Sequence, residues 1–252
     1  MAIPPSLDPS IQYLSTAEAY DRWAAVYDTD GNFLQALDTL EMKKLLPCLL
    51  ALLETSNLPQ PWKLVDLGCG TGRNTAALLQ VERAAVVGLD VSPGMLQVAR
   101  NRLVAESGLD ENVTLEVFDL LGQPGPPESA KAADAVVSTL VLEHIPTDIF
   151  FQHVAEILKP GGLLLWTNMH SEMGKLSQAG FTDPQTGKKI RPTSYAHTLA
   201  EVEETATKHG FEIVRPIEER AVDVSMVPIL GDRSRKWVGV TVWFGGILQK
   251  RH

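Results

Sequence analysis

A glycine-rich turn between a short apolar run and a helical segment constrains this chain more than any other feature. The run KLVDL is followed by Gly68, Gly70 and Gly72 within GCGTGR. Glycines at such a junction let the backbone pass close to a ligand and expose amides at a helix N-terminus. A dinucleotide fingerprint G-x-G-x-x-G would need a third glycine where Arg73 stands, and no Lys-Ser or Lys-Thr pair of a phosphate loop follows. The turn therefore disfavours a nicotinamide enzyme, and a purely structural turn is the alternative.

Beyond this turn, short β-branched runs alternate with helical segments. The runs are KLVDL, AAVVGLD, VTLEVFD, ADAVVST and GLLLWT, and two further strands are expected near residues 211 to 219 and 236 to 244. Helices are expected over residues 16 to 28 and from about 33 to 54, and a hairpin around residues 183 to 187. Alternating strands and helices with right-handed crossovers predict an α/β fold with a doubly wound, mostly parallel sheet.

Acidic residues follow the second and third of these strands. Asp90 ends the run VVGLD, and Asp119 follows the run LEVF. Parallel strands present their carboxyl ends at one edge of a sheet, where ligands bind in open α/β folds. A carboxylate in the position of Asp90 can accept both hydroxyls of a ribose, and Asp119 could accept an adenine amino group. Each aspartate alone could be a cap or turn residue, but together with the glycine turn they indicate a nucleoside ligand.

Charge and composition narrow the class of partner. The net charge is -9, and residues 168 to 252 alone have a positive balance, with 12 basic and 10 acidic residues. An acidic chain without a basic stripe disfavours nucleic acid and anionic membranes, so we expect a small-molecule partner. The first ten residues have no basic residue and no apolar core of a signal peptide, which favours a cytoplasmic protein. The sequence makes no prediction of the oligomeric state.

Five segments together resemble the class I S-adenosylmethionine-dependent methyltransferases: VDLGCGTGRNT, VVGLDVSPGMLQVAR, LEVFDL, ADAVVSTLVLEHIP and ILKPGGLLLWT. The resemblance covers roughly residues 16 to 167. It implies a seven-stranded Rossmann-like sheet of order 3-2-1-4-5-7-6 with strand seven antiparallel. It also implies S-adenosyl-L-methionine as cofactor and S-adenosyl-L-homocysteine as product.

The same resemblance assigns residues to the site. Asp66 and the three glycines line the methionine end, Asp90 takes the ribose, and Asp119 with its neighbours holds the adenine. An N-terminal lid resembling that of the ubiquinone- and menaquinone-type small-molecule methyltransferases would carry Tyr20, Trp23 and Tyr27, for which ordinary helix packing is the alternative. The implied cofactor-binding residues are Tyr20, Tyr27, Asp66, Gly68, Cys69, Gly70, Gly72, Asp90, Val91, Met95, Asp119, Leu120 and Thr139. The implied substrate-binding residues are Trp23, Tyr195 and Asn168.

We therefore expect one methyltransferase domain over residues 1 to 252. Its parts are an N-terminal helical lid (1–60), a cofactor-binding core (61–167), a substrate-covering hairpin insertion (168–197) and a C-terminal helix with strands (198–252).

Three histidines are candidate bases: His144 after the fourth strand, and His170 and His197 beyond the fifth. An imidazole suits proton transfer near neutral pH, and His170 is better placed than His144. His144 could instead have a structural role beside the cofactor, and its neighbour Glu143 could be a capping or structural group. No metal is expected, because no acidic residue shows a tight ligand spacing with His170 or His197, and Glu172 is the only near candidate.

The sequence thus predicts a methyltransferase that acts on a small, partly apolar metabolite, with O-methylation in secondary metabolism ahead of C-, N- or S-methylation. The activated methyl group needs mainly positioning, and a base only where the acceptor must lose a proton. Two alternatives stay open. The chain could bind the cofactor as a regulatory or adaptor protein without turnover, or it could use the sulfonium charge for a cyclisation or elimination.

Overall fold

A seven-stranded sheet organises the computed structural model, which describes residues 8–56, 58–107 and 112–252. Its strand order is β4-β3-β2-β5-β6-β10-β9, and β10 runs antiparallel to both neighbours. This is the order that the resemblance to the methyltransferase family implied. The strands are β2 (Trp62–Leu67), β3 (Ala84–Asp90), β4 (Val113–Val117), β5 (Ala133–Thr139), β6 (Leu158–Met169), β9 (Phe211–Ala221) and β10 (Thr241–Lys250).

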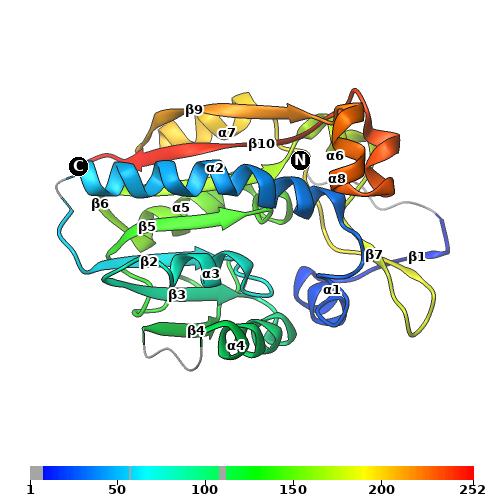
Figure 1. Ribbon diagram of the computed structural model, residues 1–252, viewed down its shortest axis with the longest axis horizontal. Coiled ribbons are helices and arrows are strands. Elements are labelled where there is room, and N and C mark those ends of the chain that lie inside the picture. Colours follow the sequence, from blue (N-terminus) through cyan, green and yellow to red (C-terminus); the bar gives the residue numbers. More distant parts are fainter. Residues whose placement is uncertain (1–7, 57, 108–111) are drawn as a thin grey trace.

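The central strands of the sheet are buried on both faces, as their apolar runs require, whereas the edge strands β4 and β9 are partly exposed. Adjacent strand residues enter opposite cores: Val86 packs in the core on one face and Val87 in the core on the other. Figure 1 shows the long helix α2 (Phe33–Thr55) lying along one face, with α5 (Thr147–Ile157) and α7 (Leu199–Lys208) behind the other. The remaining helices are α1 (Thr16–Trp23), α3 (Arg73–Leu78), α4 (Pro93–Ser107), α6 (Ser171–Leu176) and α8 (Val227–Leu230), with short 3-10 turns η1 (Leu142–His144), η2 (Val224–Met226) and η3 (Asp232–Trp237).

Local sequence signals set the helix that lies over the sheet edge. Ser15 caps α1 through a capping box with Glu18, whose backbone N–H donates to the serine hydroxyl at 3.3 Å. The helix ends at Trp23, and turns follow, so the predicted extent of 16 to 28 is wrong at its C-terminal end. The second helix matches its predicted start at residue 33 and ends one residue later than expected.

The last predicted strand is also corrected. Residues 236 and 237 belong to η3, and β10 begins only at Thr241. Gly231 adopts a positive φ of 87° and its carbonyl accepts a hydrogen bond from the Ser234 hydroxyl at 2.7 Å, which favours a turn there. The charged run from Asp232 to Lys236 is therefore left outside the buried sheet.

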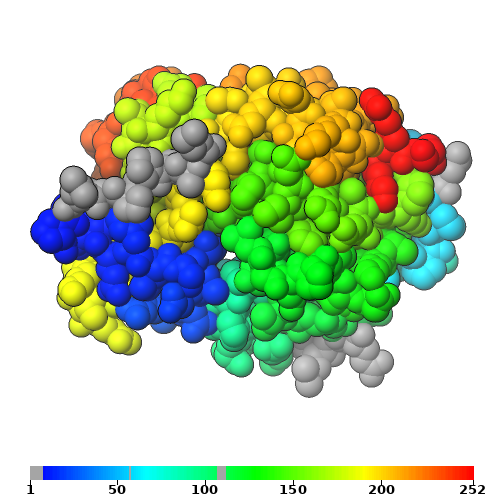
Figure 2. Space-filling view, turned by 180° about the vertical axis from the view of Figure 1, so that it is seen from behind, coloured from blue at the N-terminus to red at the C-terminus, as the bar shows by residue number. Residues whose placement is uncertain are grey.

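A second, three-stranded sheet lies at the carboxyl ends of the main strands. It joins β1 (Ile11–Tyr13) to the hairpin of β7 (Phe181–Thr182) and β8 (Lys189–Arg191), with β1 parallel to β8. Trp23 stacks on Phe181 with ring centroids 4.9 Å apart. Figure 2 shows the blue N-terminal segment beside the yellow hairpin. The predicted hairpin is confirmed, and it lies against the segment expected to form a lid.

Two further expectations concern the termini and membranes. The first ten residues, whose composition favoured a cytoplasmic protein, lie partly outside the described residues, which begin at residue 8. Within the ranges that the structure describes, no helix has the length and apolar character needed to cross a bilayer.

Candidate active site

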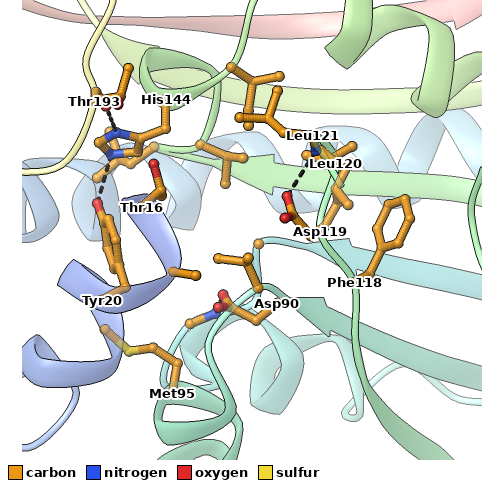
Figure 3. A pocket seen from close by; sticks show the side chains of 18 of the residues that line it. Thr16, Tyr20, Asp90, Met95, Phe118, Asp119, Leu120, Leu121, His144 and Thr193 are labelled. Carbon is orange, nitrogen blue, oxygen red and sulfur yellow. Dashed lines mark hydrogen bonds between the residues drawn. The ribbon is translucent and has the colours of Figure 1, made fainter. Parts of the chain in front are cut away.

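A cavity of about 300 Å³ opens between the carboxyl ends of the central strands and α1 (Figure 3). Its walls come from the loops after β2, β3, β4 and β5 and from the helix above them. The residues that line it are Ser15, Thr16, Ala17, Tyr20, Tyr27, Leu67, Gly68, Gly70, Asp90, Val91, Met95, Phe118, Asp119, Leu120, Leu121, Thr139, Leu140, Val141, His144, Ile145 and Thr193. Four consecutive strand ends thus meet at one hollow, as the motif positions predicted.

The glycine turn forms the floor of this cavity. Gly68, Gly70 and Gly72 have φ of 73°, 53° and 80°, a conformation that other residues rarely adopt. A Cβ on Gly68 would lie 2.2 Å from a methyl group of Val141, whereas a Cβ on Gly70 would meet no atom within 4 Å. The turn therefore keeps its backbone close to β5 and leaves open space beside Gly70 for a ligand.

Asp90 presents a carboxylate to the same cavity. One oxygen accepts the N–H of Gly70 at 2.8 Å and the other accepts the N–H of Ser92 at 2.9 Å. Each oxygen keeps a further lone pair for a hydroxyl donor. Burial raises the pKa of Asp90 to about 6, so the group is charged at pH 7 and both ribose hydroxyls can donate to it.

The far end of the cavity is mostly apolar. Asp119 accepts the N–H of Leu121 at 2.9 Å, and Figure 3 shows this bond beside Phe118 and Leu120. Met95 is fully buried in the wall below. Apolar and aromatic walls with one acceptor carboxylate suit an adenine ring and its amino group.

Three of the implied cofactor residues lie behind the cavity wall. Asp66 is fully buried and accepts the hydroxyl of Thr75 at 2.6 Å, and burial raises its pKa to about 6. Cys69 is 6% exposed, and burial raises the pKa of its thiol well above the usual value. Gly72 packs against Ala99 of α4. Asp66, Cys69 and Gly72 hold the turn in place, and the cavity lining does not include them.

Arg73, the residue that breaks the dinucleotide fingerprint, ties the turn to α2. Its guanidinium donates to the buried carboxylate of Asp38 at 2.7 Å. Thr139, at the end of β5, accepts a hydrogen bond from Asn74 at 2.8 Å and lines the cavity. The arginine therefore has a structural partner that the sequence alone did not indicate.

His144 and Tyr20 lie next to each other at one side of the cavity, and their side chains point toward one another (Figure 3). The Nδ1 of His144 lies 2.7 Å from the carbonyl oxygen of Thr193, and its Nε2 lies 2.8 Å from the Tyr20 hydroxyl. A carbonyl only accepts, so Nδ1 carries the proton and Nε2 of the neutral ring accepts from the tyrosine. Burial lowers the pKa of His144 to about 4, which keeps the ring neutral at pH 7.

The structure does not bring the other two histidines to this cavity. His170 caps α6 by accepting the N–H of Glu172 at 3.1 Å, and its Nε2 lies 2.9 Å from Glu219. His197 is buried, and its Nε2 donates to the carbonyl oxygen of Ile145 at 2.9 Å. Neither histidine is part of either cavity lining, so the expectation that both flank the acceptor pocket is not met.

The three residues that the resemblance implied for substrate binding do not line this cavity either. Asn168 is fully buried and accepts the N–H of Glu143 at 2.9 Å. Tyr195 stacks on His197 with an interplanar angle of 7° and donates its backbone N–H to the carbonyl of Glu143 at 2.7 Å. Asn168 and Tyr195 thus fix the backbone of Glu143 from opposite sides. Trp23 lines a second cavity.

This second cavity, of about 100 Å³, adjoins the first. Tyr20, Tyr27 and Leu140 line both. Its other lining residues are Trp23, Asn32, Phe33, Leu34, Glu143, Met169, Met173, Ser177, Gln178, Ala179, Gly180, Lys189, Arg233, Lys236 and Trp237. They come from the N-terminal segment, the region after β6, the hairpin and η3, which are far apart in the sequence.

Glu143 is the acid of this cavity. It is 3% exposed, one oxygen accepts the N–H of Met169 at 3.4 Å, and the other lies 4.0 Å from Nε2 of His144. Burial raises its pKa to about 7, although the Met169 bond lowers it. Sequence reasoning noted Glu143 only as a capping or structural group. Its place beside His144 in the LEHIP segment was the signal that could have marked it.

The described residues contain no group of three or more His, Cys, Asp or Glu side chains placed to hold a metal ion.

Comparison with known proteins agrees with this geometry. Residues 65–164 match the family model described as "Methyltransferase domain". An uncharacterized methyltransferase from Emericella nidulans is 53% identical over 93% of this chain and 91% of its own length. The mitochondrial ubiquinone biosynthesis O-methyltransferase of Mus musculus is 34% identical over 43% of this chain, a match that spans only 29% of that relative.

A solved S-adenosylmethionine dependent methyltransferase from Mesorhizobium loti has the same fold. It is similar with a TM-score of 0.57 and 23% identity, over 81% of this chain and 96% of that one. The long, 53% identical match to a methyltransferase, together with the cavity at the strand ends, identifies this chain as a member of the class I S-adenosylmethionine-dependent methyltransferase family.

Proposed function

We propose that this S-adenosylmethionine-dependent enzyme methylates a hydroxyl oxygen of a small, partly apolar metabolite held in the second cavity. The observation that carries the proposal is the buried carboxyl of Glu143, which lines a cavity that shares Tyr20, Tyr27 and Leu140 with the larger one. An acceptor in the second cavity lies next to the cofactor and beside a base.

The larger cavity fits the cofactor. Asp90 would hold the ribose, Asp119 with Met95 and Leu120 would hold the adenine, and the open space beside Gly70 would take the methionine end. When bound, S-adenosylmethionine supplies a methyl group already activated by the positive sulfur. The chain's own contribution is to orient the acceptor, exclude water and remove a proton.

Glu143 is suited to remove that proton. A pKa of about 7 places the carboxylate close to the pH at which general bases work best. The hydroxyl proton would pass to a Glu143 oxygen while the acceptor oxygen takes the methyl group that S-adenosylmethionine would supply, with S-adenosylhomocysteine as the other product. The proton is then released to solvent when the product leaves.

His144 is a weaker candidate for the base. Its Nε2 lone pair already accepts the Tyr20 hydroxyl, and its pKa of about 4 makes protonation unfavourable at neutral pH. We propose that it positions Tyr20 over the boundary between the two cavities. Asn168 and Tyr195 are proposed to act through the backbone of Glu143, and Trp23 to pack against the acceptor.

The acceptor's apolar part is inferred from the lining. Trp23, Phe33 and Trp237 are each at most 6% exposed and contribute aromatic surface to the second cavity. The N-terminal segment and the hairpin that carry part of this lining are proposed to act as its cover. The small volume and the net charge of -9 favour a metabolite over nucleic acid.

The experiment incubates the purified chain with S-adenosylmethionine and a panel of catechols, phenols, amines and thiols of one to three rings. Mass spectrometry counts methylated product and S-adenosylhomocysteine together. The proposal predicts methyl transfer to oxygen with a 1:1 ratio of the two products. Methylation restricted to nitrogen, sulfur or carbon would contradict it, and so would turnover of an acceptor without S-adenosylhomocysteine.

A further inference from the structure

We propose that the second cavity selects acceptors that carry a carboxylate, which Lys189, Arg233 and Lys236 bind. This inference rests on the proposed function, because it assumes that the second cavity holds the acceptor. It adds a chemical class to that acceptor: a hydroxyl group at one end and an anionic oxygen group at the other.

The three cations come from two separate segments. Lys189 opens β8 of the hairpin, whereas Arg233 and Lys236 belong to η3. All three line the cavity. Their charges lie close enough to act on one another: after burial, the positive charges of Arg191, Lys236 and Arg233 lower the pKa of Lys189. Positive charges that repel one another therefore lie close together at this wall of the cavity, although the chain as a whole has a net charge of -9.

Local carboxylates compensate these charges only in part. Arg233 donates to the backbone carbonyl of Asp30 at 2.6 Å, and its distance to the Asp30 carboxylate is 3.9 Å. That carboxylate also accepts the indole N–H of Trp23 at 2.9 Å. Across the residues that the structure describes, neither Lys189 nor Lys236 has an ion pair with an acidic side chain. Two lysine charges at the cavity are thus available to an anionic ligand.

Glu143 lies in the same lining but pairs with none of these cations. Its oxygens contact the N–H of Met169 and approach His144. A ligand carboxylate next to Glu143 would be repelled, and one next to the lysines would be attracted. The lining therefore holds a carboxyl group that is not paired with the cations, and cations that can attract a ligand carboxylate. This arrangement orients a hydroxy acid with its hydroxyl toward Glu143.

The aromatic side chains of the second cavity offer an apolar surface next to the cations. Lys236 lies 5.2 Å from the ring centroid of Trp237, which itself stacks on Phe33 at 5.9 Å. Trp237 thus holds Lys236 over an apolar wall, and the lysine still has hydrogen-bond donors for a carboxylate. A hydroxylated aromatic or unsaturated carboxylic acid combines the surface and charge that this wall offers.

The test measures binding without turnover. The complex of the chain with S-adenosylhomocysteine is titrated with 3,4-dihydroxybenzoate and with 3,4-dihydroxybenzamide, which differ in charge and hardly in shape. Quenching of tryptophan fluorescence reports the dissociation constants, since Trp23 and Trp237 line the cavity. We expect the acid to bind at least about threefold more tightly than the amide at low salt, with the difference shrinking as salt rises.

The variants Lys189→Met and Lys236→Met locate the effect. Each should weaken binding of the acid by about 1.5- to 5-fold and leave the amide unchanged. Lys188→Met is the matched control, because Lys188 precedes Lys189 in the same hairpin and is not in the lining of the second cavity. Far-ultraviolet circular dichroism checks that all three variants fold.

Equal affinity for acid and amide would overturn the inference. So would absence of acid binding at millimolar concentration, or an equal loss in the Lys188 control. The two proposals fail separately, because methyl transfer is read as product mass and carboxylate selection as affinity in the absence of transfer. A chain that prefers the acid but never methylates oxygen would retain this inference and lose the proposed function.

Discussion

The two cavities lie side by side but are built in opposite ways. The cofactor cavity is lined mainly by loops that each directly follow a strand, such as the turn with Gly68 and the ends of β3 and β4. The second cavity takes Leu140 and Glu143 from the segment after β5, but most of its lining comes from the N-terminal segment, the start of α2, the end of β6, the hairpin and η3. One site is therefore a property of sheet topology, and the other depends on how distant segments pack above it.

This difference separates structural features that proteins of this fold have in common from features that are particular to this chain. Any parallel sheet of this order brings the ends of its central strands together, so the first cavity accompanies the fold. The second cavity depends on β1 pairing with β8 and on Trp23 stacking on Phe181. We infer that cofactor chemistry is encoded in the core and acceptor choice in the segments around it. The predictions below test that division.

The largest effect is expected from Glu143→Gln, which removes the base and keeps the shape of the side chain. With saturating cofactor, kcat for a hydroxyl acceptor should fall by about 10²- to 10⁴-fold. Glu172→Gln is the control, because Glu172 is exposed, precedes Met173 of the second cavity without lining it, and accepts the N–H of Thr241 at 3.2 Å. Retention of full activity by the Glu143 variant would show that the acceptor needs no base from this cavity.

The dependence of kcat on pH should show the titration of Glu143. Glu143 acts when it is deprotonated, and burial raises its pKa to about 7, with a further rise from Asp38. His144, its nearest titratable neighbour, is neutral throughout because its pKa is about 4. We therefore expect kcat to fall about tenfold per pH unit below pH 7 and to level off above it. Cofactor must be saturating, since the pKa of Asp90 is about 6. A flat profile between pH 6 and 8 would contradict the assignment.

The sequence predicted the first cavity better than the second one. The glycine turn and the strand-end positions of Asp90 and Asp119 were predictable, because strand and turn signals are local and the sheet edge follows from topology. The strand order came only from the family resemblance. The places of His170 and Lys189 were not. Whether a residue after β6 faces a cavity or caps a helix depends on side-chain packing from distant segments, and His170 caps α6.

A smaller effect is expected at the boundary that both cavities share. Tyr20→Phe removes the hydroxyl that donates to Nε2 of His144 and leaves that nitrogen buried without a partner. The free energy of unfolding, measured in urea, should fall by about 1–3 kcal/mol. Tyr195→Phe, whose ring stacks on His197, serves as the control. An unchanged stability would mean that water replaces the Tyr20 hydroxyl.

The most direct test of the division is a calorimetric titration with S-adenosylhomocysteine of the wild type, Asp90→Ala and Glu143→Gln. It needs no knowledge of the acceptor. Asp90→Ala removes the acceptor of the ribose hydroxyls and should raise the dissociation constant by about 10- to 150-fold, which corresponds to about 1.5–3 kcal/mol. Glu143→Gln should leave it within about twofold, because Glu143 lines only the second cavity. Equal losses in both variants, or none in Asp90→Ala, would contradict the assignment of one cavity to the cofactor and the other to the acceptor.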